Sequence, residues 1–205
     1  MVRKIYYKKV PDIYKKISFD DIIGDYIANT KKAVQNFLTV RKNIFIYGDV
    51  GTGKTALLWC LVNEIYKNHS TTKNYKTLQT MPYEFIEPRP EFKFSFVTSV
   101  DLIESLRARF KRDCKLEEWE KDCYDSAKMS KILLLDELGL QYGTEREHIE
   151  FFNLFNYRYE NRLPTIATSN ITPKQIQEKL GKRIYDRFFS DCQIFKLEGD
   201  SMRWK

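Results

Sequence analysis

Residues 48–55 spell GDVGTGKT, and their types and spacing suit the binding of phosphate groups. The run matches the pattern G-x-x-x-x-G-K-[ST], in which glycines let the backbone curl until several N–H donors converge on phosphate oxygens. The positive end of a following helix adds to the attraction. Lys54 would bind the terminal phosphates, and Thr55 would offer its hydroxyl to Mg²⁺. The segment therefore predicts a site for ATP with Mg²⁺.

The surroundings of this motif fit its chemistry. An apolar run at 44–47 precedes it and helix-compatible residues at 55–67 follow, so that it lies between a strand and a helix. We expect the nucleotide contacts to come from one continuous segment, namely Gly48, Asp49, Val50, Gly51, Thr52, Gly53, Lys54, Thr55 and Ala56.

A second candidate lies at 131–137, KILLLDE, where an apolar strand ends in two acids. Such a strand would deliver Asp136 toward Mg²⁺, usually through water, and Glu137 would polarise the attacking water as a general base. Two acids after a strand are common surface features. Their pairing with a phosphate-binding motif is what indicates ATP hydrolysis.

Composition sets the limits within which these motifs act. With 205 residues, 42% of them hydrophobic, the chain can bury one substantial core. The net charge of +7 favours a polyanionic partner such as nucleic acid, although the base composition of a genome can produce the same excess of lysine. The cysteines show neither metal-ligand spacing nor a disulfide pattern, and no apolar run could span a membrane. We expect a cytoplasmic protein.

The remaining chain reads as alternating strands and helices. Further strands are predicted at 94–98, 131–136, 165–169 and 193–197, and helices at 100–110, 116–129, from 144 onward and through 172–189. Capping boxes at Thr144 and Thr172 mark two of the helix starts. The segment 68–93 is predicted to be a long connection with little regular structure. Apolar strands that alternate with helices indicate a parallel sheet covered on both faces.

Two further expectations concern packing and domain organisation. Phe151, Phe152, Phe155 and Tyr159 share one face of the helix that follows 144, and we expect that face to be core. Residues 1–18 read as a basic and aromatic N-terminal arm ahead of an ATPase domain at 19–205. The arm could stack on bases or, slightly favoured, pack over the core.

The sequence resembles the DnaC/IstB branch of AAA+ ATPases. The resemblance covers residues 19–203 and adds ATSN at 167–170, RIYDRF at 183–188 and GDSMR at 199–203 to the two motifs above. It implies an α/β P-loop NTPase fold, with an AAA+ core whose five-stranded parallel sheet is sandwiched by helices. No sizeable C-terminal lid domain is expected.

The same resemblance implies roles for residues far from the phosphate motif. Asn170 is similar to a sensor residue near the γ-phosphate and the attacking water, although it could simply cap the strand end. Arg187 resembles an arginine finger that reaches a neighbouring subunit's ATP, with Arg183 as a second candidate. A surface arginine is the alternative. Arg203 resembles a late sensor arginine that touches the phosphates.

An arginine finger implies an ATP-dependent homo-oligomer. In relatives, the helices that correspond to those between 100 and 129 line a path for single-stranded DNA. Candidate DNA contacts there are Arg107, Arg109, Lys111 and Arg112, although an ordinary charged helix is the alternative. The leading hypothesis is a DNA-associated ATPase that acts as a helicase loader on single-stranded DNA in replication. An IstB-like transposition helper with a transposase partner, and an ATP-gated interaction module with little hydrolysis, remain open.

Overall fold

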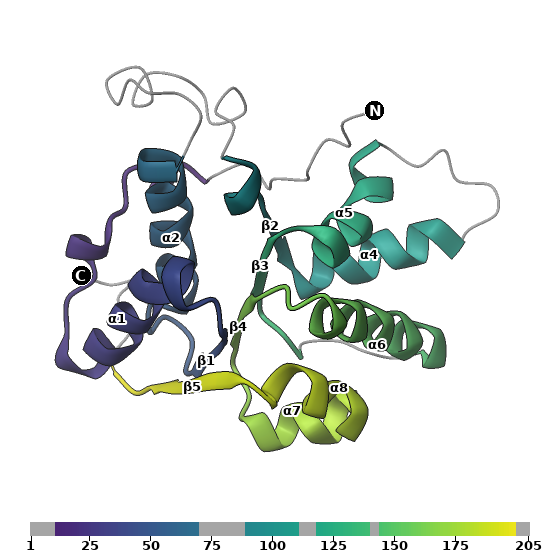
Figure 1. The fold of residues 1–205 in the computed structure, drawn as a ribbon. Coiled ribbons are helices and arrows are strands. Elements are labelled where there is room, and N and C mark those ends of the chain that lie inside the picture. Colours follow the sequence, from purple (N-terminus) through teal and green to yellow (C-terminus); the bar gives the residue numbers. More distant parts are fainter. Residues whose placement is uncertain (1–10, 70–88, 111–117, 140–143, 200–205) are drawn as a thin grey trace.

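A five-stranded parallel sheet forms the centre of the protein (Figure 1). The computed structural model describes residues 11–69, 89–110, 118–139 and 144–199. The strands are β1 Asn43–Gly48, β2 Phe94–Thr98, β3 Ile132–Asp136, β4 Thr165–Ser169 and β5 Cys192–Leu197. Their order across the sheet is β2-β3-β4-β1-β5, so β4 lies between the strand that precedes the phosphate motif and the strand that carries the acids. The predicted fold class is confirmed.

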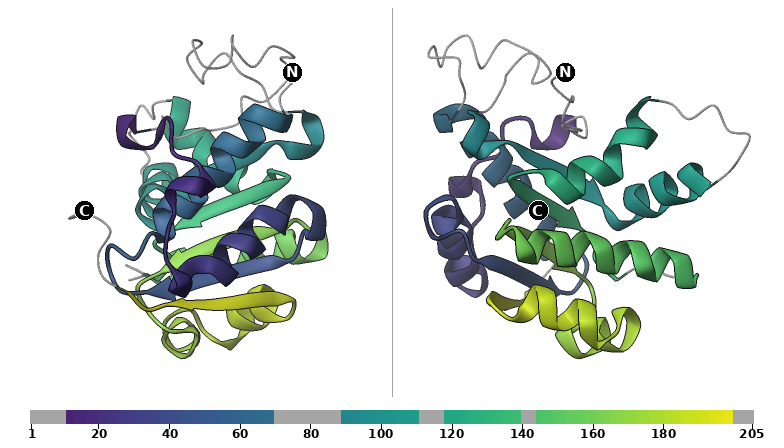
Figure 2. Two further views of the ribbon diagram at one scale, coloured as in Figure 1. Left: turned by 90° about the vertical axis from the view of Figure 1, so that its left-hand side faces the viewer. Right: turned by 45° about the vertical axis from the view of Figure 1, so that its right-hand side comes forward.

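Helices cover both faces of this sheet, and Figure 2 shows the layers from two further sides. One face carries α1 Asp25–Val40 and α2 Lys54–His69. The other carries α4 Ser99–Phe110, α5 Glu118–Met129, α6 Glu145–Glu160, α7 Pro173–Leu180 and α8 Lys182–Phe189. Short 3₁₀ turns lie at η1 Asp12–Tyr14, η2 Phe19–Asp21 and η4 Pro90–Phe92. No lid domain follows β5 within the described chain, which continues only through 198–199.

Strands β1 to β4 are mostly apolar and buried because helices cover both of their faces, whereas β5 is partly exposed and carries Gln193 and Lys196. In β1, Ile44 and Ile46 pack against α1 and α2, whereas Phe45 joins the cluster under α4 to α8. In β3 the same alternation sends Leu133 and Leu135 to the second cluster. Since β-strand side chains point to opposite faces in turn, a continuous apolar run is what a sheet between two helical layers requires.

The helix α1 was not predicted from the sequence. Its buried residues Ile27, Thr30, Val34 and Phe37 follow helical spacing, but they are separated by polar and charged positions and one of them is a threonine. The helix ends at Val40, and the capping residue Arg41 has a left-handed backbone with φ of 53°. The pattern is therefore a real amphipathic stripe, but too narrow to stand out by periodicity alone.

The expected core face of α6 is wrong at one position. Phe151 and Phe155 are buried and Phe152 is half-buried, but Tyr159 is 49% exposed. Arg158 takes the core position instead, fully buried and hydrogen-bonded to carbonyl oxygens that include those of Ser130 and Pro164, at 3.0 and 2.7 Å. A charged side chain can enter a core when its donors are satisfied, and residue type alone does not reveal this.

The end of the proposed N-terminal arm packs on the domain over 11–18. The ring of Tyr14 stacks on Trp59 with centroids 5.9 Å apart. The Asn63 side chain donates to the carbonyl oxygens of Tyr14 and Ile17 at 2.9 and 2.7 Å. Residues 1–10, and most of the predicted connection at 68–93, lie outside the described residues. In the described chain, no helix is long and apolar enough to cross a membrane.

Candidate nucleotide-binding and catalytic site

The carboxyl ends of β1, β3 and β4 meet at one edge of the sheet. Tyr47 pairs with Ser169 across β1 and β4, and Leu135 pairs with Ala167 across β3 and β4. The residues that follow these pairs therefore come together, which is where ligands bind in open parallel sheets. This register brings the loop at 49–53, the acid pair and Asn170 to the same edge.

Three glycines at this end of the sheet have backbone conformations that are unfavourable for residues with a side chain. Gly48 has φ of 149°, and a Cβ added there would lie 2.1 Å from the carbonyl oxygen of Leu197 on β5. Gly51 and Gly53 have φ of 88° and 93°. These left-handed conformations turn the loop back over the start of α2, as the sequence motif predicts. The Thr52 hydroxyl closes the turn by donating to the Asp49 carbonyl oxygen at 2.9 Å.

The ammonium group of Lys54 lies within the curve of this loop. Its side chain is nearly buried, at 8% exposed, and Nζ donates to the carbonyl oxygens of Gly48 and Asp49 at 2.7 and 2.6 Å. A second cation lies near the same edge, because Lys196 of β5 pairs with Tyr47. A hydrogen bond to Glu198 raises the pKa of Lys196 and keeps it charged. The loop thus combines backbone donors with positive charge, as phosphate binding demands.

Thr55 and Asp136 converge from two different elements. The Thr55 hydroxyl, in the first turn of α2, donates to the Asp136 carboxylate with oxygen–oxygen distances of 3.0 and 3.2 Å. A hydroxyl beside a carboxylate is the kind of oxygen pair that fits Mg²⁺, which takes few protein ligands and completes its shell with phosphate and water. Within the described residues, no group of three or more His, Cys, Asp or Glu side chains could hold a metal ion. Together with nucleotide phosphates, the Thr55 and Asp136 oxygens could complete a shell for Mg²⁺.

Thr168 on β4 connects the two acids, and the sequence reasoning assigned it no role. Its buried hydroxyl donates to Asp136 Oδ1 and accepts the backbone N–H of Glu137 at 3.0 Å. Its carbonyl oxygen also accepts the N–H of Leu138 at 2.7 Å. The sequence does show Thr168 as a hydroxyl residue on a predicted strand, and such a residue can reach an acid on the neighbouring strand. That β3 and β4 are neighbours, however, is known only from the order of strands in the sheet.

Glu137 has an unusual backbone conformation. Its φ is 61°, a left-handed value that costs a residue with a side chain about 1–3 kcal/mol. The contacts of Thr168 with residues 137 and 138 offset this cost. Ser169 adds another, because its hydroxyl donates to the Leu138 carbonyl oxygen at 2.6 Å. The turn is thereby fixed with the half-buried Glu137 side chain at the carboxyl edge of the sheet.

Asn170 is exposed and directly follows β4. Because β4 lies between β1 and β3 in the sheet, Asn170 lies in space between the phosphate loop and the acid pair. Its neighbour Ser169 anchors the turn, since Ser169 Oγ also accepts the N–H of Ile171 at 3.2 Å. Because Ser169 pairs with Tyr47, Asn170 comes next to the start of the phosphate loop at Gly48. This placement suits a polar group that senses a terminal phosphate.

Arg187 lies toward the amino ends of the strands, opposite the phosphate loop. The next residue in α8, Phe188, accepts a hydrogen bond at 2.9 Å from the side chain of Asn43, where β1 begins. The five residue steps of β1 separate that end from Gly48 by about 17 Å. Arg187 Nε donates to Asn156 Oδ1 at 3.0 Å, and the guanidinium lies 5.1 Å from the ring centroid of Tyr159. This arginine is therefore placed away from the phosphate loop of its own chain.

Of the other candidate cations, Arg183 is exposed in the first turn of α8. Arg107 and Arg109 on α4 form ion pairs within the chain. Arg107 Nε contacts Glu147 Oε1 at 2.7 Å while its side chain stays 54% exposed, and Arg109 Nη2 contacts Asp125 Oδ2 at 2.8 Å. Lys111, Arg112 and Arg203, the remaining candidate site residues, lie outside the described residues.

The site's geometry agrees with a comparison against known protein families. The family of IstB-like ATP binding proteins matches residues 28–205. The chain belongs to this family. The resemblance to the DnaC/IstB branch of AAA+ ATPases is confirmed.

Relatives of this IstB-like chain include replication proteins. It is 28% identical over 191 residues to the chromosomal replication initiator protein DnaA of Geotalea daltonii, a match that covers 89% of this chain and 37% of that protein. The structure of AMPPCP-bound DnaA from Aquifex aeolicus has a TM-score of 0.67 at 25% identity, covering 91% of this chain and 51% of that one. The structure of the DnaC helicase loader also has a TM-score of 0.67, at 17% identity, and the match covers 92% of this chain and 100% of that one. The two proteins share the fold. The chain thus spans less than half of the DnaA relative.

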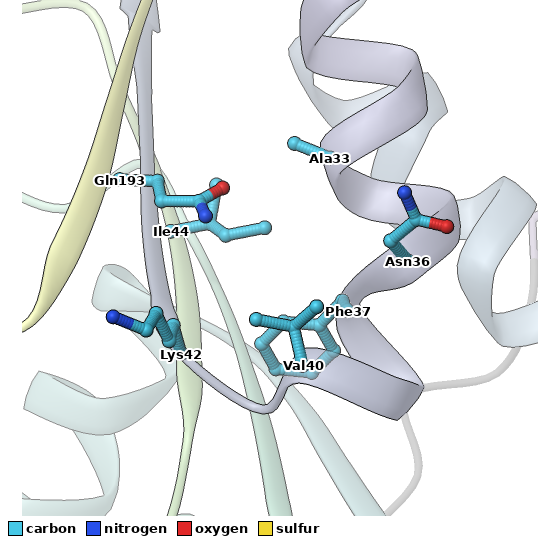
Figure 3. Close-up of a pocket in the computed structure, with 7 residues that line it drawn as sticks. All are labelled: Ala33, Asn36, Phe37, Val40, Lys42, Ile44 and Gln193. Carbon is cyan, nitrogen blue, oxygen red and sulfur yellow. The ribbon is translucent and has the colours of Figure 1, made fainter.

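A small pocket of this IstB-like protein lies elsewhere and is not the nucleotide site. It has a volume of about 90 Å³ and lies between the end of α1 and the amino ends of β1 and β5 (Figure 3). Val40 and Gln193 are among the residues that line it. Gln193 pairs with Ile44 near the start of β1, so the pocket is at the edge of the sheet opposite the phosphate loop.

Proposed function

We propose that this chain is an ATPase that binds ATP with Mg²⁺ at the carboxyl edge of the sheet and hydrolyses it. The observation that carries the proposal is the shared set of hydrogen bonds of Thr55, Asp136 and Thr168 beside the phosphate loop. These contacts bring a cation-binding oxygen pair, a candidate base and a phosphate cradle together from three elements. A DnaA relative of the same fold has been solved with the ATP analogue AMPPCP, which supports nucleotide binding here.

Each residue then has a defined task. Backbone N–H groups of the loop and Lys54 bind the β- and γ-phosphates, and Thr55 with Asp136 would hold Mg²⁺. When bound, Mg²⁺ neutralises charge on the phosphate oxygens. Glu137 accepts a proton from the attacking water, and Asn170 orients that water near the γ-phosphate. The fixed turn at 137–138 keeps the base in place before the nucleotide arrives.

Completion of this site requires a second copy of the chain. Arg187 lies at the amino ends of the strands, away from the phosphate loop of its own chain. As an arginine finger, it would therefore neutralise transition-state charge at the ATP of a neighbouring subunit. Arg183, one turn earlier on α8, is the second candidate. ATP would thereby stabilise a homo-oligomer, since the nucleotide contacts residues of both subunits.

The biological role we propose is helicase loading on single-stranded DNA during replication. It is supported by the replication proteins among the relatives, a DnaA initiator and the DnaC helicase loader. The net charge of +7 favours DNA, with Arg107, Arg109, Lys111 and Arg112 as candidate contacts. The IstB-like family match favours a second candidate, a transposition helper that partners a transposase.

The test is the ATPase rate of the full chain with and without single-stranded and double-stranded DNA, at two salt concentrations. Lys54→Ala and Glu137→Gln serve as comparison variants. We expect hydrolysis that DNA stimulates and salt weakens. It should be lost in Lys54→Ala and reduced to a small residual rate in Glu137→Gln, which should still bind ATP. Stimulation by single strands favours the helicase-loader role, and stimulation by duplex favours the transposition role. Wild-type protein that binds ATP without hydrolysing it would exclude the ATPase proposal.

A further inference from the structure

The hydroxyl of Thr168 connects the metal-binding acid with the backbone of the candidate base. A hydroxyl has one proton to donate and lone pairs to accept with. Here the proton goes to Asp136 Oδ1, and a lone pair accepts the N–H of Glu137 at 3.0 Å. The residue is 1% exposed, so water does not compete for these bonds.

These bonds replace the regular ladder of the sheet at the point where β3 ends. The paired positions of β3 and β4 stop at Leu135 and Ala167. Beyond them, the N–H of Glu137 bonds to a side chain, and the N–H of Leu138 bonds to the Thr168 carbonyl oxygen at 2.7 Å. The chain can therefore leave the strand at Glu137, where φ is 61°, without losing its hydrogen bonds.

We propose that Thr168 is a positioning residue that sets Glu137 and Asp136 in register for ATP hydrolysis. It is buried and acts through its hydrogen bonds to the two acidic residues. The inference rests on the proposed ATPase function and adds to it a coupling between the strand that carries Asn170 and the catalytic base. A displacement of β4 by the terminal phosphate would reach Glu137 through this hydroxyl.

Three substitutions separate the hydroxyl from the shape of the side chain. Thr168→Val keeps the volume but removes the hydroxyl that accepts the N–H of Glu137. Thr168→Ser keeps the hydroxyl and loses a methyl group. Ser95→Ala is a matched control, because the buried Ser95 hydroxyl on β2 has no hydrogen-bond partner among the described residues.

For Thr168→Val we expect kcat to fall roughly 10- to 100-fold, as for other lost bonds behind a catalytic group, with the KM for ATP little changed. Thr168→Ser should keep most of the wild-type kcat, and Ser95→Ala should keep all of it. In a Glu137→Gln background, measured by single turnover, Thr168→Val should cost much less than it does alone, because both changes act on the same step. A purely structural role would instead lower kcat equally in both backgrounds.

The outcomes separate this inference from the ATPase proposal. A wild-type chain without hydrolysis, or a silent Glu137→Gln, contradicts the proposed function itself. If Glu137→Gln strongly lowers the hydrolysis rate while Thr168→Val matches the wild type, only the role of Thr168 is excluded. If Thr168→Val fails to bind ATP, Thr168→Ser is compared with Thr168→Ala, and equal rates for that pair overturn the inference.

Discussion

Gly48 marks the point where β1 becomes the phosphate loop, and the space around it leaves no room for a side chain. The Leu197 carbonyl oxygen of β5 would lie 2.1 Å from an added Cβ. That oxygen belongs to the backbone of a neighbouring strand and cannot rotate away. Close approach of β5 therefore explains the first glycine of the motif, whereas the proposed phosphate contact would explain those at 51 and 53.

A matched pair of glycines tests this explanation at the scale of single residues. Gly48→Ala and Gly181→Ala both place a methyl group on a left-handed backbone, with φ of 149° and 82°, but nothing lies within 4 Å of the added Cβ at Gly181. We expect Gly181→Ala to lose about 1–3 kcal/mol of unfolding free energy through backbone strain alone, and Gly48→Ala to lose more. Urea unfolding measures both. Equal losses would show that contact with β5 is unimportant.

The packing of α8 against α6 determines where the proposed arginine finger points. Asn156 and Tyr159, both on α6, hold the Nε atom and the flat face of the Arg187 guanidinium. In the proposed oligomer, the outer nitrogens of Arg187 would reach the neighbouring subunit. A half-exposed tyrosine beside an arginine thus has a role in orientation, although the sequence pattern placed it in the core.

This orientation gives a prediction at the scale of elements. Tyr159→Phe keeps the aromatic face and should hydrolyse ATP like the wild type, because the attraction between cation and ring survives. Tyr159→Leu removes that face and should lower kcat several-fold without weakening ATP binding. Steady-state kinetics, with thermal melts to confirm folding, measure both. If the Leu and Phe variants have the same kcat, the ring does not orient Arg187.

Comparison of sequence with structure shows which parts were predictable. The phosphate loop and the acidic strand were, because each is a local pattern whose spacing is set by the ligand. The helix α1 was not, since Thr30 interrupts its apolar stripe. Nor was the core role of Arg158, which depends on carbonyl oxygens of Ala127 and Ser130, about 30 residues earlier in the sequence. Thr168 was missed for a similar reason, because its contact with Asp136 needs the order of strands across the sheet.

At the scale of the whole molecule, the two halves of the proposed active site lie at opposite ends of the strands, the carboxyl ends and the amino ends. The phosphate loop follows the carboxyl end of β1, while Arg187 lies beside Asn43 at its amino end. One copy cannot bring both to the same phosphate without unfolding the strand between them. Under the proposed role of Arg187, a complete site would be formed by two copies in a head-to-tail arrangement, and such interfaces form rings or open helical assemblies.

Mixing two inactive variants tests this arrangement directly. Lys54→Ala lacks a working phosphate loop but keeps its arginine, and Arg187→Ala keeps the loop but lacks the arginine. We expect each alone to be inactive and their mixture to recover part of the wild-type ATPase rate, because the arginine of the first variant can complete the loop of the second. The recovered rate should be highest when both are present in comparable amounts. If instead Arg187→Ala alone hydrolyses ATP at the wild-type rate, the arginine has no part in catalysis; if the mixture stays inactive although both variants bind and assemble with wild-type protein, Arg187 acts within its own chain.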